Sequence, residues 1–138
     1  MKVELHLDCE FDKTPPICVF GSKHNSREHQ LQKSNIVVLD FDIESEDHLS
    51  IDFANKDDAD DNVVVIKKML VDSIDLQHFL LKGEFTPRYN MDWYREQDPK
   101  PPLVYVPCTE LRHSGVWRIK LKTPIWKMIM EEWLDDQR

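Results

Sequence analysis

Apolar and polar residues alternate one by one in several short segments of this chain, and this alternation is the strongest constraint on its fold. A period of two places one row of side chains on each face of an extended strand, so that one face is buried and the other is hydrated. The pattern occurs at Lys2 to Asp8, Val37 to Ile43, His48 to Phe53 and Gly115 to Lys122. These segments predict a protein built mainly from half-buried β-strands.

Shorter strands are expected between these segments. Ile17 to Phe20 is apolar and follows a pair of prolines, residues 63–66 are β-branched with an apolar pattern that continues to Leu76, and Leu103 to Val106 is apolar between prolines. Residues 21–33 are polar and predict a hairpin or a surface loop. Seven or eight short strands separated by turn signals favour one domain over residues 1–138, an antiparallel β-sandwich resembling a jelly roll.

The alternation also predicts which residues fill the core of the sandwich. They are the apolar members of the strand patterns, namely Leu39, Phe41, Leu49, Ile51, Phe53, Val71, Trp117, Ile119 and Leu121. A chain of 138 residues has the usual size of one domain and is long enough to close such a core.

A loop with four aspartates in five residues follows the strand pattern that ends at Phe53. We expect this loop to join two antiparallel strands. Clustered oxygen ligands are what Ca²⁺ requires, so the loop is a candidate calcium site. The predicted ligands are Asn55, Asp57, Asp58, Asp60 and Asp61. The alternative is a solvated turn, because repulsion between exposed carboxylates is small and screened by salt.

The residues around this loop resemble those of calcium-dependent carbohydrate-binding modules, the xylan-binding β-sandwiches. Phe53-Ala54-Asn55-Lys56-Asp57 and Asp61-Asn62-Val63-Val64-Val65 stand in matching places, and 71–74 is similar to a later segment of that family. An arginine and a glycine of the family's pattern are missing here. The resemblance implies a sandwich that binds calcium and polysaccharide.

Residues 83–107, which we call the excursion, have a different composition. They contain five of the eight prolines and four of the seven tryptophan and tyrosine residues. Proline disfavours helix, so we expect turns and extended chain lying over the domain. The candidate interface or sugar-binding residues are Tyr89, Trp93, Tyr94 and Tyr105. Such aromatic side chains serve core packing, protein contacts or sugar stacking, and composition does not separate these roles.

A short helix is predicted at the C-terminus, after Pro124. Trp126, Ile129, Met130 and Trp133 recur at helical spacing. This stripe either closes one end of the sandwich or, if exposed, anchors another subunit, and we include Trp126 and Trp133 among the candidate interface residues.

The charge distribution argues against several classes of function. The net charge is −8, and residues 40–61 alone contain ten acidic residues and one lysine. Binding of nucleic acid or of an anionic membrane needs lysine and arginine, so neither partner is expected. No segment is apolar enough to span a membrane, and the N-terminus begins directly with a strand pattern, so no signal peptide is expected.

The motifs for catalysis that we considered are absent from the sequence. There is no P-loop or Rossmann glycine pattern and no G-x-S-x-G motif, and the histidines are scattered. Cys9, Cys18 and Cys108 are odd in number and lack metal-site spacing, so we expect reduced, partly buried thiols and a reducing site of synthesis. The expected protein is therefore not an enzyme.

The chain as a whole resembles small accessory proteins of tailed bacteriophages. The similar segments are PPICVFGSK, HLSIDFANK, EFTPRYNMDWY and SGVWRIKLKTPIW. The resemblance implies a non-catalytic structural protein of the virion head, neck or tail that is assembled in the host cytoplasm. Its expected partners are other virion proteins or copies of itself, or host-surface polysaccharide. The alternative function is a calcium-dependent polysaccharide-binding module.

Overall fold

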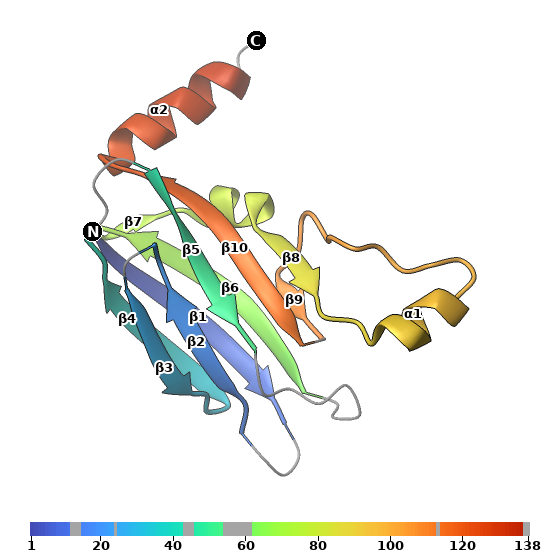
Figure 1. The fold of residues 1–138 in the computed structure, drawn as a ribbon. Coiled ribbons are helices and arrows are strands. Elements are labelled where there is room, and N and C mark those ends of the chain that lie inside the picture. The colour runs from blue at the N-terminus through green and yellow to red at the C-terminus, as the bar shows by residue number, and fades with distance from the viewer. Residues whose placement is uncertain (12–14, 24, 43–45, 54–61, 113, 137–138) are drawn as a thin grey trace.

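Two antiparallel sheets face each other in the computed structural model, as Figure 1 shows. The structure describes residues 1–11, 15–23, 25–42, 46–53, 62–112 and 114–136. Little of this is helical apart from a helix at the C-terminal end. The predicted all-β class and the antiparallel β-sandwich with a short C-terminal helix are therefore confirmed.

The first sheet has the order β4-β1-β6-β7, and β9 pairs with the other end of β6. Its central strand β1 pairs with β4 from Lys2 opposite Asp40 to Asp8 opposite Ser34, and with β6 on its other side. The strands are β1 (Lys2–Glu10), β4 (Ser34–Asp40), β6 (Val63–Val71), β7 (Ile74–Asp75) and β9 (Glu110–Leu111).

The second sheet has the order β3-β2-β5-β10-β8, and its long central pair is β5 with β10. The strands are β2 (Ile17–Gly21), β3 (Ser26–Gln30), β5 (Glu46–Asp52), β8 (Glu84–Pro87) and β10 (Gly115–Lys122). The helices are η1, a 3-10 helix (Gln77–Lys82), α1 (Met91–Glu96) and α2 (Ile125–Asp136).

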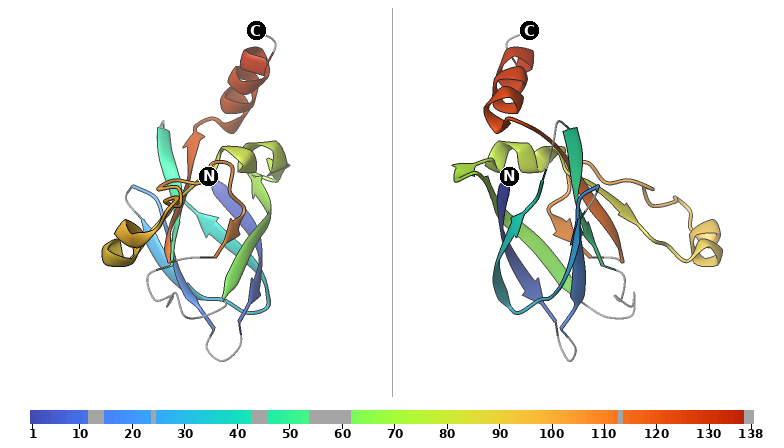
Figure 2. Two further views of the ribbon diagram at one scale, coloured as in Figure 1. Left: turned by 90° about the vertical axis from the view of Figure 1, so that its right-hand side faces the viewer. Right: turned by 60° about the vertical axis from the view of Figure 1, so that its left-hand side comes forward.

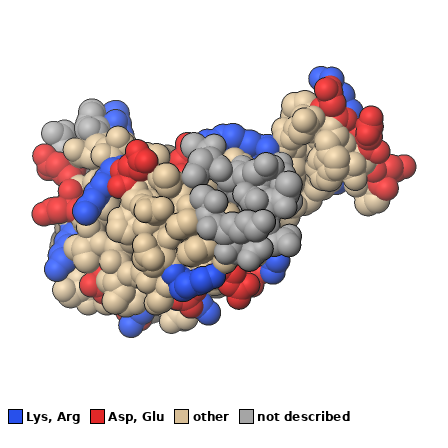
Figure 3. Space-filling model, turned by 90° about the horizontal axis from the view of Figure 1, so that it is seen from below, with Lys and Arg blue, Asp and Glu red and all other residues tan. Residues whose placement is uncertain are grey.

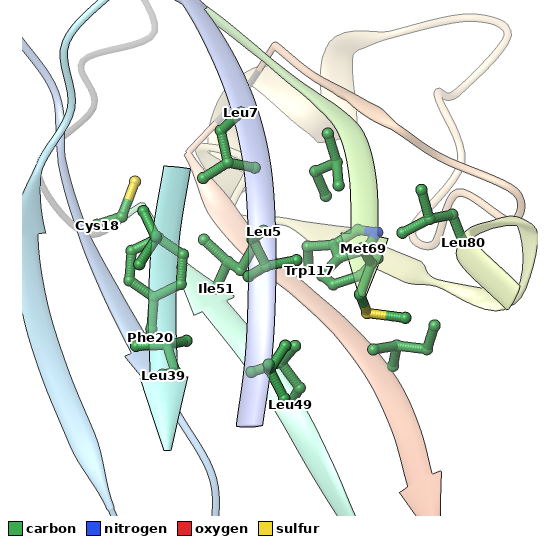
Figure 4. Packing of buried hydrophobic residues seen from close by; sticks show 14 of the residues in the cluster. Leu5, Leu7, Cys18, Phe20, Leu39, Leu49, Ile51, Met69, Leu80 and Trp117 are labelled. Atoms are coloured by element: carbon green, nitrogen blue, oxygen red, sulfur yellow. The ribbon is translucent and has the colours of Figure 1, made fainter. Parts of the chain in front are cut away.

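Side chains from the inner faces of both sheets form one core. Figure 4 shows Leu5 and Met69 from one sheet directed toward Ile51 and Trp117 from the other. The predicted core residues Leu39, Phe41, Leu49, Ile51, Phe53, Val71, Trp117, Ile119 and Leu121 are all buried. The period-two pattern thus assigned the inner faces of these strands correctly.

One predicted pairing is wrong. We expected the strands on either side of the aspartate loop to pair with each other, but β5 belongs to the second sheet and β6 to the first. The connection therefore crosses between sheets. Alternation in a sequence shows which face of a strand is buried, and it does not show which strand lies next to it.

Other differences concern short elements. The polar segment 21–33 takes the hairpin alternative, since it contains β3, which pairs antiparallel with β2 and, at the edge of the sheet, needs no apolar alternation. A helix, α1, occupies part of the excursion, where we expected none. The strand expected at Leu103 to Val106 is reduced to one bridge between Tyr105 and Phe85. The three cysteines are free, as expected.

Candidate interaction surfaces

Two elements project from the sandwich. Figures 1 and 2 show the excursion with α1 leaving one side of the molecule and α2 standing clear of the sheets at one end. Of the large apolar residues that are exposed in the described ranges, most belong to these two elements: Met91, Trp93, Leu103, Val104 and Val106 on the excursion, and Trp126, Met130, Trp133 and Leu134 on α2. Concentrated apolar surface of this kind marks interaction sites.

The base of the excursion is fixed by Trp117, which is fully buried. At the outgoing end, Gly83 packs so closely on the indole that a Cβ atom there would lie 2.4 Å from Trp117 Cζ2. At the returning end, the Trp117 indole N–H donates a hydrogen bond of 2.9 Å to the carbonyl oxygen of Cys108. One core side chain thus holds both ends of the excursion.

Further contacts tie the excursion to the second sheet. The backbone N–H groups of Phe85 and Tyr105 each donate to the other residue's carbonyl oxygen, at 3.0 and 2.8 Å. Arg88 donates from its backbone to Ser114 and from Nη2 to the Asp52 carboxylate, at 2.7 Å in each case. The first half of the excursion therefore belongs to the second sheet, because β8 pairs with β10 and Arg88 bonds to Ser114 and to Asp52 of β5, while Tyr105 joins the returning half to β8.

Tyr89 and Tyr94 of the excursion pack against each other, whereas Tyr105 also packs against the sandwich core. The Tyr89 ring stacks on Tyr94 with 5.4 Å between centroids and lies 5.7 Å from Trp93. Its hydroxyl lies 3.1 Å from the Tyr105 hydroxyl and donates to the Pro102 carbonyl oxygen at 2.8 Å. Burial is the main cause that raises the pKa of Tyr89, and the hydrogen bond with Tyr105 adds to it. Tyr89 is thus the centre of a small core within the excursion.

Short-range hydrogen bonds explain why α1 forms between prolines. The Asn90 side chain accepts from the backbone N–H groups of Asp92 and Trp93 and caps the N-terminus of the helix. At the other end, Lys100 Nζ donates to the carbonyl oxygens of Arg95 and Gln97. This arrangement leaves Trp93 45 % exposed. Figure 3 shows the projecting end of the excursion, with uncharged surface beside residues of both charges.

Helix α2 has two apolar faces. Ile125 and Met128 are buried against the body, and Ile129 packs partly against the core. The opposite face carries Trp126, Met130, Trp133 and Leu134, of which the tryptophans are 63 % and 55 % exposed. The spacing i, i+4, i+7, i+8 places these four side chains in one stripe, which we call the α2 stripe.

Ion pairs connect the inner side of α2 to the body. Lys122 Nζ lies 2.9 Å from Glu131 Oε2, and Lys82 pairs with Glu132. The hydrogen bond and charge of Lys122 hold the pKa of Glu131 below its usual value, and Glu131 raises the pKa of Lys122. The four paired residues also line a cavity of about 240 Å³, together with Phe79, Ile119 and Met128. These contacts attach one side of the helix to the body.

The structure brings the predicted interface residues together in two separate groups. Tyr89, Trp93, Tyr94 and Tyr105 form the excursion cluster, and Trp126 and Trp133 lie on α2. The self-packing alternative for the two α2 tryptophans does not fit their exposure, because other residues of the helix make the contact with the body. The sequence did not identify five further exposed residues as candidates, because an apolar side chain carries no sign that it will face solvent. They are Met91, Leu103, Val104, Val106 and Leu134.

The predicted calcium ligands Asn55, Asp57, Asp58, Asp60 and Asp61 lie outside the described residues. Within the described ranges, no group of three or more histidine, cysteine or acidic residues is arranged to hold a metal ion. Nor does that part of the chain contain a helix with the length and apolar character needed to cross a membrane.

Comparisons with protein families, curated proteins and solved structures found no match to this chain. The arrangement of side chains on the two projections is therefore what supports a function.

Proposed function

We propose that this chain is a non-catalytic assembly protein, a structural or accessory component of a larger particle such as the virion of a tailed bacteriophage. The observation that carries the proposal is the separation between a closed core and exposed apolar projections. The sandwich buries its own apolar faces, whereas Trp93, Trp126 and Trp133 are about half exposed on elements that stand away from it. A few aromatic anchors that lose water on binding dominate most protein interfaces.

The construction of the excursion supports the same proposal. A loop that served only to connect β8 to β9 would need neither an internal tyrosine core nor a capped helix. These features hold Met91 and Trp93 in a defined position in solvent, and preorganised side chains bind with a smaller loss of conformational entropy. The resemblance to phage accessory proteins gives the kind of particle, with other virion proteins or further copies of the chain as partners.

The test is incorporation of the chain into its particle, measured as the amount of protein that remains bound after purification of the assembly. Trp93→Ala and Trp133→Ala should reduce incorporation while leaving the thermal midpoint of the isolated protein nearly unchanged. The matched control is Ile36→Ala on β4, which is 63 % exposed but belongs to the sandwich body. Normal incorporation of both tryptophan variants would contradict the proposal.

The alternative function, calcium-dependent polysaccharide binding, predicts a different result. In that case the monomer should bind a specific polysaccharide in the presence of calcium, and Trp93→Ala should abolish this binding alone. The ring of Tyr89 is already stacked on Tyr94, so within the excursion cluster Trp93 is the most exposed ring for a sugar. Affinity electrophoresis in gels with and without polysaccharide separates the two functions.

A further inference from the structure

The outer face of the second sheet is hollowed between β10 and the residues that follow β2. Gly21 of β2 stands opposite Ser50 of β5, so two neighbouring strands lack a bulky side chain at this level (Figure 1). The Ser50 hydroxyl donates to the Gly21 carbonyl oxygen at 3.3 Å, which keeps this side chain close to the sheet. The hollow has a volume of about 460 Å³ and is lined in part by Lys23, His48 and Arg118. Its size is that of a small-ligand pocket.

Hydrogen bonds within the chain fix the rim of the hollow. The Asp47 carboxylate accepts from the backbone N–H of Lys23 at 3.0 and 3.1 Å and from the backbone N–H of His48 at 2.7 Å. The backbone N–H of Ser22 donates to the Asn25 carbonyl oxygen at 2.8 Å. Both oxygens of Asp47 are therefore engaged, and the backbone that carries Lys23 is held in place before any ligand binds.

Two cationic side chains at the hollow have no carboxylate partner. Among the residues that the structure describes, neither Lys23 nor Arg118 forms an ion pair. Glu84 of β8 stands opposite Arg118 in the strand register, but the two side chains are not paired. Glu46, which also lines the hollow, is already paired with Lys120 at 2.8 Å. The charge that remains for a ligand is therefore positive, although the chain as a whole has a net charge of −8.

A buried hydroxyl beside these cations also lacks a partner. Ser22 lines the hollow, and its Oγ atom is buried without a hydrogen bond to any residue that the structure describes. Nearly all buried polar groups in native proteins are hydrogen-bonded, so this exception needs an explanation. A ligand oxygen that reaches Ser22 would supply the missing bond.

These groups fit an anion that also carries hydroxyl groups. The guanidinium of Arg118 has the planar donor geometry that suits a carboxylate or a phosphate, and Lys23 adds a second positive charge. Ser22 and His48 can exchange hydrogen bonds with hydroxyl groups beside the anion. We propose that the hollow binds an acidic sugar, either a sugar acid or a sugar phosphate, with its anionic group between Lys23 and Arg118. The hollow lies on the sandwich body, so this inference does not rest on the proposed assembly function.

The first experiment titrates the purified full chain with glucuronate and with glucose 6-phosphate and follows its amide NMR signals. Saturable shifts are expected for the signals of Ser22, Lys23, His48 and Ser50. Glucose should bind at least about tenfold more weakly, because it offers no charge to Lys23 and Arg118. If neither acidic sugar binds saturably, or if glucose binds equally well, the proposal is overturned. Acetate or inorganic phosphate that bound as tightly as the sugars would show that the hollow takes a free anion and that the sugar is wrongly assigned.

The second experiment repeats the titration with variants. Arg118→Gln should weaken binding about tenfold to a hundredfold, because it removes hydrogen bonds to a charged group. Arg118→Lys retains the charge without the planar fork and should recover only part of the affinity. The matched control is Lys67→Gln on β6, which loses the same charge from the other sheet, and it should bind as the wild type does. Unchanged binding by Arg118→Gln, or an equal loss in Lys67→Gln, would refute the proposed site.

A chelator separates this site from the calcium-dependent alternative. The proposed ligand contacts do not include the aspartate loop, so EDTA should leave the affinity for the acidic sugar unchanged. Loss of binding on chelation would assign the sugar to a calcium site and contradict the proposal. Since the experiments measure ligand binding by the isolated chain, their failure is distinguishable from failure of incorporation into a particle.

Discussion

Replacement of Gly83 by alanine should destabilise the fold, although the backbone at this position suits any residue. Gly83 has φ −65° and ψ 134°, which is ordinary extended geometry. The obstacle is steric, because the added Cβ would lie 2.4 to 2.5 Å from Trp117 Cζ2, Nε1 and Cε2. Carbon atoms in contact are normally about 3.5–4.0 Å apart, so the indole or the backbone must move by about 1 Å.

The cost has two parts. Overpacking of a closed core costs about 1 to 3 kcal/mol. Movement of the indole also weakens the hydrogen bond from Trp117 to the Cys108 carbonyl oxygen, which contributes about 0.5 to 1.5 kcal/mol. We therefore expect a loss of about 2 to 4 kcal/mol in the free energy of unfolding, measured by urea denaturation with circular dichroism.

Gly21 provides a matched control. A Cβ there would meet Ser50 Oγ at 3.2 Å, and this hydroxyl is the end of a short side chain that can rotate. Gly21→Ala should therefore change stability by less than about 1 kcal/mol, with some gain from the alanine in a strand. The steric explanation also predicts that Gly83→Ala costs less in a Trp117→Leu background. Equal effects of the two glycine substitutions, or no coupling to residue 117, would refute it.

Three further predictions concern calcium, pH and thiol reactivity. If the aspartate loop binds calcium, millimolar calcium should raise the thermal midpoint of unfolding, because a ligand that binds the folded state stabilises that state. Asp57→Ala should abolish this gain. A midpoint that calcium does not change would mean that the loop is a solvated turn. Lys122 lowers the pKa of Glu131, so the ion pair stabilises the attachment of α2 fully at pH values above 4.5, the usual pKa of a glutamate. This stabilisation is lost as the pH falls through the lower pKa that Glu131 has in the folded protein. Amide NMR signals of α2 should therefore shift in acid, and a Glu131→Gln variant that shifted in the same way would disprove the assignment. Burial raises the pKa of the Cys18 thiol, so a thiol reagent should modify Cys108 first and Cys18 only after unfolding, and equal rates in the folded protein would count against the described core.

The sequence predicted the buried faces of the strands better than their arrangement. Hydration of one face of a strand is a local property, so Leu49, Ile51 and Phe53 could be assigned to the core from their spacing alone. Which strands become neighbours depends on contacts distant in the sequence. That is why β5 and β6 were expected to pair and instead belong to different sheets.

For the candidate surfaces, too, the sequence identified residues of interest but not the contacts that decide their orientation. The composition of the excursion identified Tyr89 and Trp93 as residues of interest, but the structure gives them different roles, since Tyr89 packs inside the cluster and Trp93 faces solvent. On α2, the sequence placed Ile129 in one stripe with the tryptophans. In the structure Ile129 faces the body instead. Its orientation depends on where β10 and η1 lie, and the spacing of residues along a helix gives no information about that.

The attachment of the excursion through Trp117 also has a consequence for how such a protein can evolve. Substitutions at exposed tip residues such as Met91 or Leu103 remove no contact from the sandwich core, so selection can change them to fit a new partner with little loss of stability. Substitutions at Gly83 or Trp117 alter the core and are expected to be purged. Diverging descendants of this chain would then keep the base of the excursion and vary its tip, in the way that antibody loops vary on a constant framework.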